Sequence, residues 1–307
     1  MLSKIKYYFS LFSAYGFKYG SISLAAVIFN KINANGFLAH RFHKIQYSLV
    51  VMYLENQFAQ LINEYKNQRY KSKRIGEQDY VWVCWWQGLN DAPSLVKACI
   101  KNLKEKSNGR RVIVIDKNNY SDYLNVPSTI LDKVENGKIS ITFLSDILRF
   151  MLLAKYGGVW VDATLFVNNS LPSMNKYEFY TIKHGLFSEW HICGGKWSSF
   201  FMASGQNNTG VSLIRDMLIK YAELDQPWMA YLLTDAAIKA AYNNLDQFKA
   251  EIDMIPINNQ NVFQMAEELN QSSENYHCPT NLNKLTYKQN FSVKRNNVYA
   301  ALVSGKL

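Results

Sequence analysis

The sequence SDILRFMLLAKYGGVWVDAT, residues 145–164, predicts a helix, a sharp turn and a strand in immediate succession. We expect the helix to begin at Ser145 and to end at Gly157-Gly158, because glycine adopts the backbone conformation that terminates a helix. The apolar run Val159-Trp160-Val161 is typical of a short buried strand. This order of elements favours a fold in which helices cover a sheet.

Charged residues at both ends of this stretch make it a candidate site. Asp146 and Arg149 are three residues apart, so they share one face of the predicted helix. Asp162 follows the strand directly. Carboxylates and a guanidinium are the groups needed to bind sugar hydroxyls and a diphosphate leaving group. The alternative is a structural Asp146–Arg149 pair and a solvent-facing Asp162.

The residues before this stretch predict a parallel sheet. The apolar run at 80–86 and the strand at 111–115 flank an amphipathic helix at 94–106, an order that requires a parallel crossover. In such sheets ligands bind beyond the carboxyl ends of the strands. The side chains expected at that edge are those of Trp85, Trp86, Asp116 and Asn118. Further strands are expected near 179–183 and 200–203, and helices at 208–224 and 228–244.

The N-terminal quarter of the chain differs from the rest in charge. The protein has 307 residues and a net charge of +10. Residues 1–74 hold eleven basic and two acidic residues, which gives this stretch a net charge of +9. We therefore predict a basic helical extension over residues 1–75 and an α/β domain over residues 76–307. The longest apolar stretch noted in the extension, Ile22–Phe29, is shorter than the ~20 residues that cross a bilayer.

Three partners are open for the basic extension. Aromatic residues between Tyr7 and Phe17 accompany the lysines, as in elements that lie on anionic membranes. Nucleic acid is the rival partner of a basic surface, and a solvated helix without a partner is the third reading. Four scattered cysteines indicate free thiols in a reducing compartment, and no signal peptide is visible. We expect a protein on the cytoplasmic face of a bacterial inner membrane, without a nucleic-acid partner.

Three segments resemble a known family. Residues 145–164 resemble the donor-site segment of GT-A glycosyltransferases with an Asp-X-Asp (DXD) motif, a group that includes the capsular polysaccharide synthesis proteins, yeast-type mannosyltransferases and clostridial toxin glucosyltransferase domains. VWVCWWQGLNDAPSLVKACIKNLKE, residues 81–105, and NKLTYK, residues 283–288, resemble the capsular branch. The resemblance covers about 80–290. It implies a GT-A fold, which is Rossmann-like with a mostly parallel sheet. The implied reaction is hexose transfer from a nucleotide sugar, UDP-linked by preference, to a capsular, O-antigen or exopolysaccharide acceptor on a lipid carrier, with retention.

The resemblance also implies roles for individual residues. Trp82 would stack on the base of the donor, and Asp146 and Arg149 would bind its sugar and phosphate. Asp162 would be the first carboxylate of the DXD motif, with Mn²⁺ or Mg²⁺ as the cofactor. Thr164 stands where the motif has its second carboxylate, and a hydroxyl is a weaker ligand, so direct metal binding is in doubt. The remaining candidates are Asn283 and His277 as metal ligands, and Lys284 and Lys288 as cations that neutralise the diphosphate.

Two residues are candidates for the acceptor side. Trp190 lies in an aromatic, glycine-containing segment that could stack on a sugar ring, or form a buried cluster. Asp235 lies in a predicted helix where the capsular branch has an acidic residue; helix capping is the alternative.

Two other functions compete with the transferase. A non-catalytic protein could bind membrane or nucleic acid through its basic extension, with structural roles for the acidic residues. A related nucleotidyltransferase is disfavoured because the usual glycine-rich, lysine-bearing loop is missing after the first strand.

Overall fold

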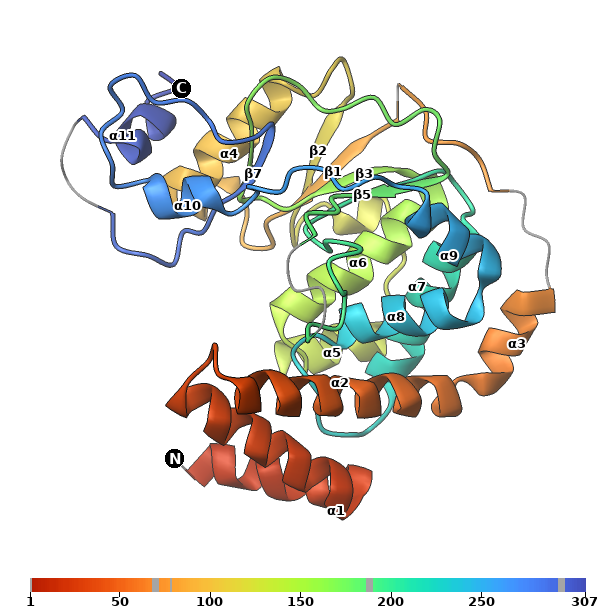
Figure 1. Ribbon diagram of the computed structural model, residues 1–307. Helices are drawn as coiled ribbons and strands as arrows, with labels where there is room; N and C mark the ends of the chain where they lie inside the picture. Colours follow the sequence, from red (N-terminus) through yellow and green to blue (C-terminus); the bar gives the residue numbers. More distant parts are fainter. Residues whose placement is uncertain (1, 68–71, 78, 186–189, 292–295) are drawn as a thin grey trace.

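A five-stranded sheet forms the centre of the computed structural model, which describes residues 2–67, 72–77, 79–185, 190–291 and 296–307 (Figure 1). Its strands, in spatial order, are β2 (Val112–Ile115), β1 (Val81–Cys84), β3 (Gly158–Val161), β6 (Phe201–Ser204) and β5 (Phe179–Thr181). β1 pairs in parallel with both β2 and β3, while β6 is antiparallel to β3 and β5. The sheet is therefore mostly parallel, and the predicted α/β fold with a helical N-terminal part is confirmed.

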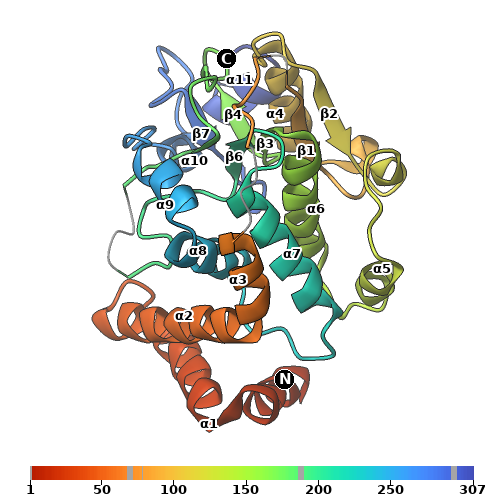
Figure 2. The same cartoon turned by 90° about the vertical axis from the view of Figure 1, so that its right-hand side faces the viewer.

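Helices cover both faces of the sheet (Figures 1 and 2). One layer contains α6 (Ile141–Tyr156), α7 (Thr209–Glu223), α8 (Leu233–Asn244) and α9 (Asp246–Asp253). The other contains α4 (Ser94–Glu105), α10 (Gln264–Glu268) and α11 (Val298–Val303), and α5 (Ser128–Glu135) lies at the periphery. Two short 3₁₀ turns, Leu89–Asp91 and Tyr120–Asp122, follow β1 and β2.

Helix α6, which carries Asp146 and Arg149, is longer than its sequence predicts. We expected it to begin at Ser145, but α6 begins at Ile141, because the Ser140 hydroxyl accepts a hydrogen bond from the Phe143 N–H and caps it. Its end is at the predicted place, where the left-handed backbone of Gly157 (φ 70°) turns the chain into β3. The extra turn adds Ile141 and Thr142 to the elements beside the sheet edge.

A second, two-stranded sheet was not foreseen. β4 (Leu165–Val167) pairs antiparallel with β7 (Leu282–Lys284), so that Leu165 lies opposite Lys284. The Leu285 N–H also donates to the Thr164 carbonyl oxygen over 2.9 Å. This pairing fixes the late segment at 282–285 directly beside the residues that follow Asp162.

The N-terminal part folds as α1 (Leu2–Ile32), α2 (Phe37–Gln57) and α3 (Ala59–Asn67). α2 lies across the helical layer and contacts α8, and α1 lies on the outer side of α2 (Figure 1). Three tyrosine hydroxyls of α1 donate to backbone carbonyls of one segment: Tyr7 to Trp228, Tyr15 to Pro227 and Tyr19 to Met229. The helices are thus packed on the α/β part. Arg69 and Lys71, two of the eleven basic residues of positions 1–74, lie outside the described residues.

α1 contains a longer apolar segment than the predicted stretch Ile22–Phe29. Lys6–Ile32 is long and apolar enough, by length and composition, to cross a membrane. Its backbone is non-helical at Gly16 (φ 81°), so that two helical pieces meet at a kink. Leu11 and Tyr19 are buried against the rest of the protein, which ties the segment to the folded domain.

Gly158 is a point at which the fold tolerates no side chain. Its φ is +98°, and a Cβ atom would overlap the Tyr80 carbonyl oxygen. We expect Gly158→Ala to lower the free energy of unfolding by about 3 kcal/mol or more, since strain and overlap add. Gly137→Ala is the control, because its φ is also positive (+68°) and nothing lies within 4 Å of the added atom. Urea denaturation of both variants measures the difference; equal losses would contradict the overlap.

Candidate active site

A pocket of about 480 Å³ lies at the edge of the sheet where β1 and β3 end. This volume suits a nucleotide-sized ligand. The end of β1 and the residues after it contribute Cys84, Trp85, Trp86 and Gln87 to the lining of the pocket. Helix α6 contributes Ile141, Thr142, Ser145, Asp146 and Arg149, and β3 with the following turn contributes Trp160, Asp162, Ala163 and Thr164. The rest of the lining is Tyr231 and residues 284–288. Segments far apart in the sequence therefore meet at the predicted edge.

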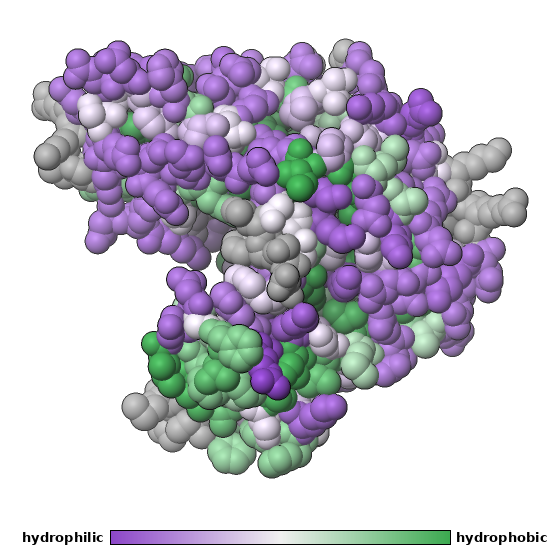
Figure 3. Space-filling view, viewed as in Figure 1, coloured by the Kyte–Doolittle hydropathy of each residue, from purple (hydrophilic) through white to green (hydrophobic). Residues whose placement is uncertain are grey.

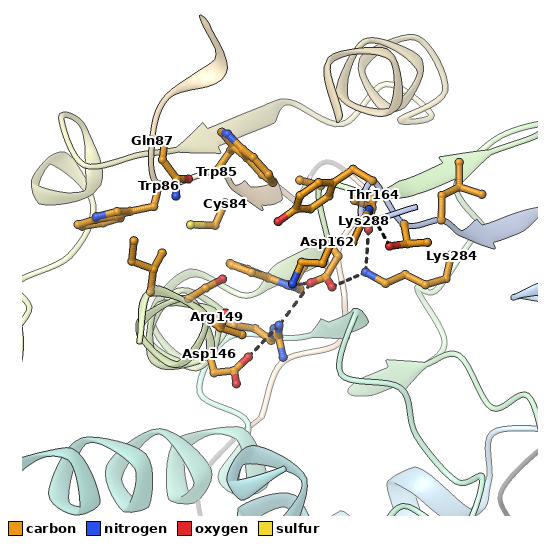
Figure 4. Close-up of a pocket in the computed structure, with 18 of the residues that line it drawn as sticks. Cys84, Trp85, Trp86, Gln87, Asp146, Arg149, Asp162, Thr164, Lys284 and Lys288 are labelled. Carbon is orange, nitrogen blue, oxygen red and sulfur yellow. Dashed lines mark hydrogen bonds and ion pairs between the residues drawn. The ribbon is translucent and has the colours of Figure 1, made fainter. Parts of the chain in front are cut away.

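Arg149 is the centre of the charged cluster in this pocket (Figure 4). Its side chain is only 5% exposed, and Nη2 lies 3.0 Å from Asp146 Oδ1 and 3.3 Å from Asp162 Oδ1. The guanidinium also lies over the Trp160 ring, 4.9 Å from its centroid. A buried cation requires such compensation, since an unpaired charge in the interior is costly. Side chains from α6 and from the end of β3 thus surround one guanidinium, that of Arg149.

Asp162 is bonded through both of its oxygens. Oδ1 accepts from Trp160 Nε1 at 3.0 Å as well as from Arg149, and Oδ2 accepts from Lys284 Nζ at 2.7 Å. Burial alone would raise the pKa of Asp162, but the Lys284 ammonium and the Arg149 guanidinium outweigh it and hold the pKa below its ordinary value. Asp162 is therefore ionised, and its carboxylate lies between two cationic side chains, Arg149 and Lys284.

Asp146 differs from Asp162 in its surroundings. Oδ2 accepts from the Thr234 hydroxyl at 2.7 Å, and burial raises the pKa although Arg149 and Thr234 oppose this. The two carboxylates of the cluster are thereby pushed apart in acidity, an arrangement that is common at catalytic sites. The structure brings together Asp146, Arg149, Asp162, Thr164, Lys284 and Lys288 from the predicted set.

The predicted role of Trp82 is wrong. Its side chain is fully buried within β1, where Nε1 donates to the Gly157 carbonyl oxygen at 2.9 Å and the ring packs beside Tyr123 and Tyr156. It does not line the pocket. Trp85 and Trp86, beyond the end of β1, do. Aromatic rings available for stacking on a base are therefore found a few residues later than the resemblance implied.

The prediction of Asn283 as a metal ligand is also wrong. Successive side chains of a strand point to opposite faces, so Lys284 enters the pocket while Asn283 is fully buried on the other side of β7. Its Nδ2 donates to the Thr280 carbonyl oxygen at 3.0 Å. His277 lines a separate pocket near the C-terminus.

The donor set beside Asp162 does not fit a divalent cation. The two motif side chains, Asp162 and Thr164, already accept from one ammonium, with Lys284 Nζ 2.7 Å from Asp162 Oδ2 and 2.9 Å from Thr164 Oγ1. Mg²⁺ and Mn²⁺ require several oxygen ligands, and an ammonium repels them. Among the described residues, no group of three or more His, Cys, Asp or Glu side chains could hold a metal ion.

The two acceptor candidates lie away from this pocket. Trp190 stacks on His40 of α2, with centroids 4.1 Å apart, and lines a second pocket of about 450 Å³ between α2 and residues 190–196. Asp235 is buried in the first turn of α8, where its Oδ1 accepts from Trp197 Nε1 at 2.9 Å. Direct contact of Asp235 with an acceptor is not supported by this position, because the side chain is 7% exposed.

Three residues line the pocket without having been predicted from the sequence pattern: Trp160, Tyr231 and Tyr287. Trp160 supports Arg149, Tyr231 lines the pocket, and Tyr287 packs edge-on against Trp85 at 5.5 Å. The signal for Trp160 was its place two residues before Asp162, which puts both side chains on one face of the strand. Tyr231 and Tyr287 lie in irregular segments that carry no periodic signal.

Comparison with known proteins identifies the family of this chain. The family model described as "capsular polysaccharide synthesis protein" matches residues 31–302. The chain belongs to the capsular polysaccharide synthesis protein family. The match is wider than the expected 80–290, and it includes α2 and α3. Family membership confirms the predicted resemblance and the enzyme class, a glycosyltransferase, and the mostly parallel sheet is consistent with the expected GT-A fold.

Other comparisons add little to the family match. A solved structure titled "PaToxG Glycosyltransferase" is similar to this chain, with 15% identity, a TM-score of 0.42, and coverage of 68% of this chain and 82% of that one. A likeness this distant says nothing about donor, acceptor or site residues. The comparison with curated proteins gave no match.

The buried position of Asp235 has a measurable consequence for stability. Burial raises its pKa to about 6; the Trp197 hydrogen bond opposes this and Asp146 adds to it. The unfolded chain has the ordinary pKa of about 4, so the native state binds the proton more tightly and loses stability as the pH rises from 4 through 6. We expect Asp235→Asn to gain about 3 kcal/mol relative to wild type between pH 4 and pH 8. Urea denaturation across this range tests it; a difference that does not vary with pH would contradict it.

Proposed function

We propose that this glycosyltransferase moves a hexose from a UDP-sugar to a lipid-linked capsular, O-antigen or exopolysaccharide acceptor, with retention, in the pocket at the ends of β1 and β3. The observation that carries the proposal is the convergence of Arg149 and Lys284 on Asp162 within this pocket. UDP, the acceptor and retention come from the resemblance of the motif segments. The contacts themselves support a ligand that has both hydroxyls and negative charge.

The lining suits the parts of a nucleotide sugar. Trp85 and Trp86 offer aromatic faces to a base, since stacking on an aromatic ring accepts any base. The lining residues include three cations, Arg149, Lys284 and Lys288, against the two carboxylates Asp146 and Asp162. This net positive charge favours a diphosphate. The carboxylates can accept hydrogen bonds from sugar hydroxyls.

The proposed reaction is the departure of a diphosphate from the anomeric carbon. The carbon–oxygen bond breaks and its electron pair stays on the diphosphate oxygen. The acceptor hydroxyl forms the new bond on the same face, and its proton passes to the departing phosphate. Arg149 holds Asp146 and Asp162 in place, and the lysines stabilise the charge that develops on the leaving group.

A donor screen with Asp162→Asn tests this function. UDP-, GDP- and CMP-sugars are offered to the purified protein, and binding is measured by calorimetry and slow hydrolysis by release of nucleoside diphosphate or, for the CMP-sugar, of CMP. We expect one donor class to bind, and Asp162→Asn to weaken its binding or hydrolysis by roughly 10- to 100-fold, the loss of a charged hydrogen-bond partner.

Asp216→Asn is the matched control for that screen. Asp216 is also 27% exposed, pairs with Arg215 and accepts from Tyr65, but lies on α7 outside the pocket. It should leave donor binding unchanged. Absence of binding for all donor classes, or equal losses in both variants, would refute the function at this site.

We further propose that the N-terminal helices bind an anionic membrane on its cytoplasmic face. Large apolar side chains are exposed along α1 and at its junction with α2; among them Phe9, Phe17, Ile32 and Phe37 are 70%, 80%, 73% and 74% exposed. Hydrophobic residues gather over this end of the molecule in Figure 3, whereas the rest of that face is mostly hydrophilic. Exposed lysines, including Lys18 and Lys31, accompany them. Apolar and basic groups together favour lipid over nucleic acid.

Co-sedimentation with vesicles tests the membrane proposal. We expect binding to phosphatidylglycerol-containing vesicles that falls with added salt, because charge attraction is screened. The double variant Phe17→Ser, Ile32→Ser should weaken it by roughly tenfold or more, since two apolar side chains no longer enter the interface. Met254→Ser is the control, an exposed apolar residue at the end of α9. Equal binding by all three proteins would contradict the assignment of this surface.

A further inference from the structure

The ammonium of Lys284 lies where a metal ion bound by Asp162 and Thr164 would have to lie. Its Nζ bridges Asp162 Oδ2 and Thr164 Oγ1, at 2.7 Å and 2.9 Å. Asp162 Oδ1 is taken by Trp160 and Arg149. An ion bound here would have to displace the ammonium and share a carboxylate that already accepts three hydrogen bonds. The side-chain oxygens of Asp162 and Thr164 thus already bind a cation of the protein itself, the Lys284 ammonium.

The backbone holds Lys284 in this place. β7 pairs with β4, so Lys284 lies opposite Leu165, the residue after Thr164. Its own N–H donates to the Val262 carbonyl oxygen at 2.7 Å, and the next N–H, that of Leu285, donates to the Thr164 carbonyl. The Phe200 ring lies 5.3 Å from Nζ. A charge that is anchored before the ligand arrives costs no reorganisation when the leaving group departs.

Lys284 also remains accessible from the pocket. Its side chain is 21% exposed, against 5% for Arg149. A lysine ammonium has three protons. Asp162 and Thr164 accept two of them, and within the described part of the chain no acceptor is recorded for the third. That proton is available to an oxygen of a diphosphate.

We propose that the Lys284 ammonium replaces the divalent cation of the DXD motif, so that donor binding and leaving-group departure in this enzyme require no metal. The inference rests on the proposed function, because it assigns the charge that stabilises the same diphosphate. When the bond from the anomeric carbon to the diphosphate oxygen breaks, the electron pair stays on that oxygen, and Lys284 donates its hydrogen bond to the diphosphate. The acceptor proton goes to the released nucleoside diphosphate, as in the reaction above. Thr164, where a second carboxylate would stand, is a neutral acceptor for the same ammonium.

The first measurement is direct and needs no donor. Mn²⁺ is titrated into the full-length protein and free Mn²⁺ is followed by electron paramagnetic resonance. We expect no stoichiometric binding up to millimolar Mn²⁺ in the wild type. The double variant Thr164→Asp, Lys284→Ala restores the second carboxylate and removes the ammonium, and should bind one Mn²⁺. A wild-type site that binds one Mn²⁺ and loses it in Asp162→Asn would overturn the proposal while leaving the transferase function intact.

The second measurement covers an ion that binds only with the nucleotide. Affinity for UDP and hydrolysis of the UDP-sugar are compared in EDTA and in Mn²⁺. We expect the wild type to differ by less than threefold between the two conditions. Lys284→Ala should weaken UDP binding by roughly 10- to 100-fold in both, and Lys284→Arg should recover most of it, because the charge is kept. Wild-type binding or hydrolysis that is lost in EDTA and restored by Mn²⁺ would refute metal independence.

Lys133→Met is the matched control for Lys284→Ala. Lys133 is half-buried and donates to the carbonyl oxygens of Ala222, Glu223 and Leu224 at the end of α7, outside the pocket. UDP affinity should be unchanged in this variant, whatever its effect on stability. Equal weakening in both variants would contradict a specific role of Lys284. Failure of the proposed function has a different signature, the absence of binding by every donor in the screen, and leaves the Mn²⁺ titration readable.

Discussion

The buried guanidinium of Arg149 is the constraint on which the site depends. It lies between Asp146 and Asp162 at 3.0 Å and 3.3 Å with little access to water. Removing one partner of a buried pair leaves a charge without compensation, which costs far more than the pair contributes. The cluster therefore couples α6, which carries Asp146 and Arg149, to the end of β3, which carries Asp162. Lys284 extends the same network to β7, so a helix, the main sheet and the small sheet share one set of charges.

The sheet explains why this network opens into a pocket. β1 and β3 are parallel neighbours, so the residues that follow both strands emerge at one edge. Trp85 and Trp86 come from the first and Asp162 from the second. Gly157 and Gly158, both with positive φ, make the turn between α6 and β3 short enough for Arg149 to lie beside Asp162. The end of β3 thus sets the position of Asp162, and the short turn before β3 places Arg149 beside it.

Local parts of the site could be predicted from the sequence, and parts that depend on long-range pairing could not. Asp146, Arg149 and Asp162 were recognisable because helical spacing and the end of a strand determine where they point. Trp82 was misplaced because β1 is buried on both faces, so its apolar sequence does not distinguish a core ring from one at the strand end. Asn283 and Lys284 differ by one residue, and only the pairing of β7 with β4 decides which enters the pocket. The start of α6 was misplaced because both Ser140 and Ser145 are residues that can cap a helix, and the cap is at Ser140.

The N-terminal helices are structurally linked to the site. Tyr15 and Tyr19 hold the carbonyls of Pro227 and Met229, and the Tyr47 hydroxyl of α2 accepts from the Leu232 N–H. This segment carries Tyr231, which lines the pocket, and leads directly to Thr234, which bonds Asp146. The family match begins at residue 31 and includes α2, the helix that supports the chain leading to Thr234 and Asp146. The N-terminal helices and the charged cluster are therefore connected through one short stretch of backbone, and displacement of α2 would reach the Asp146 carboxylate through Leu232 and Thr234.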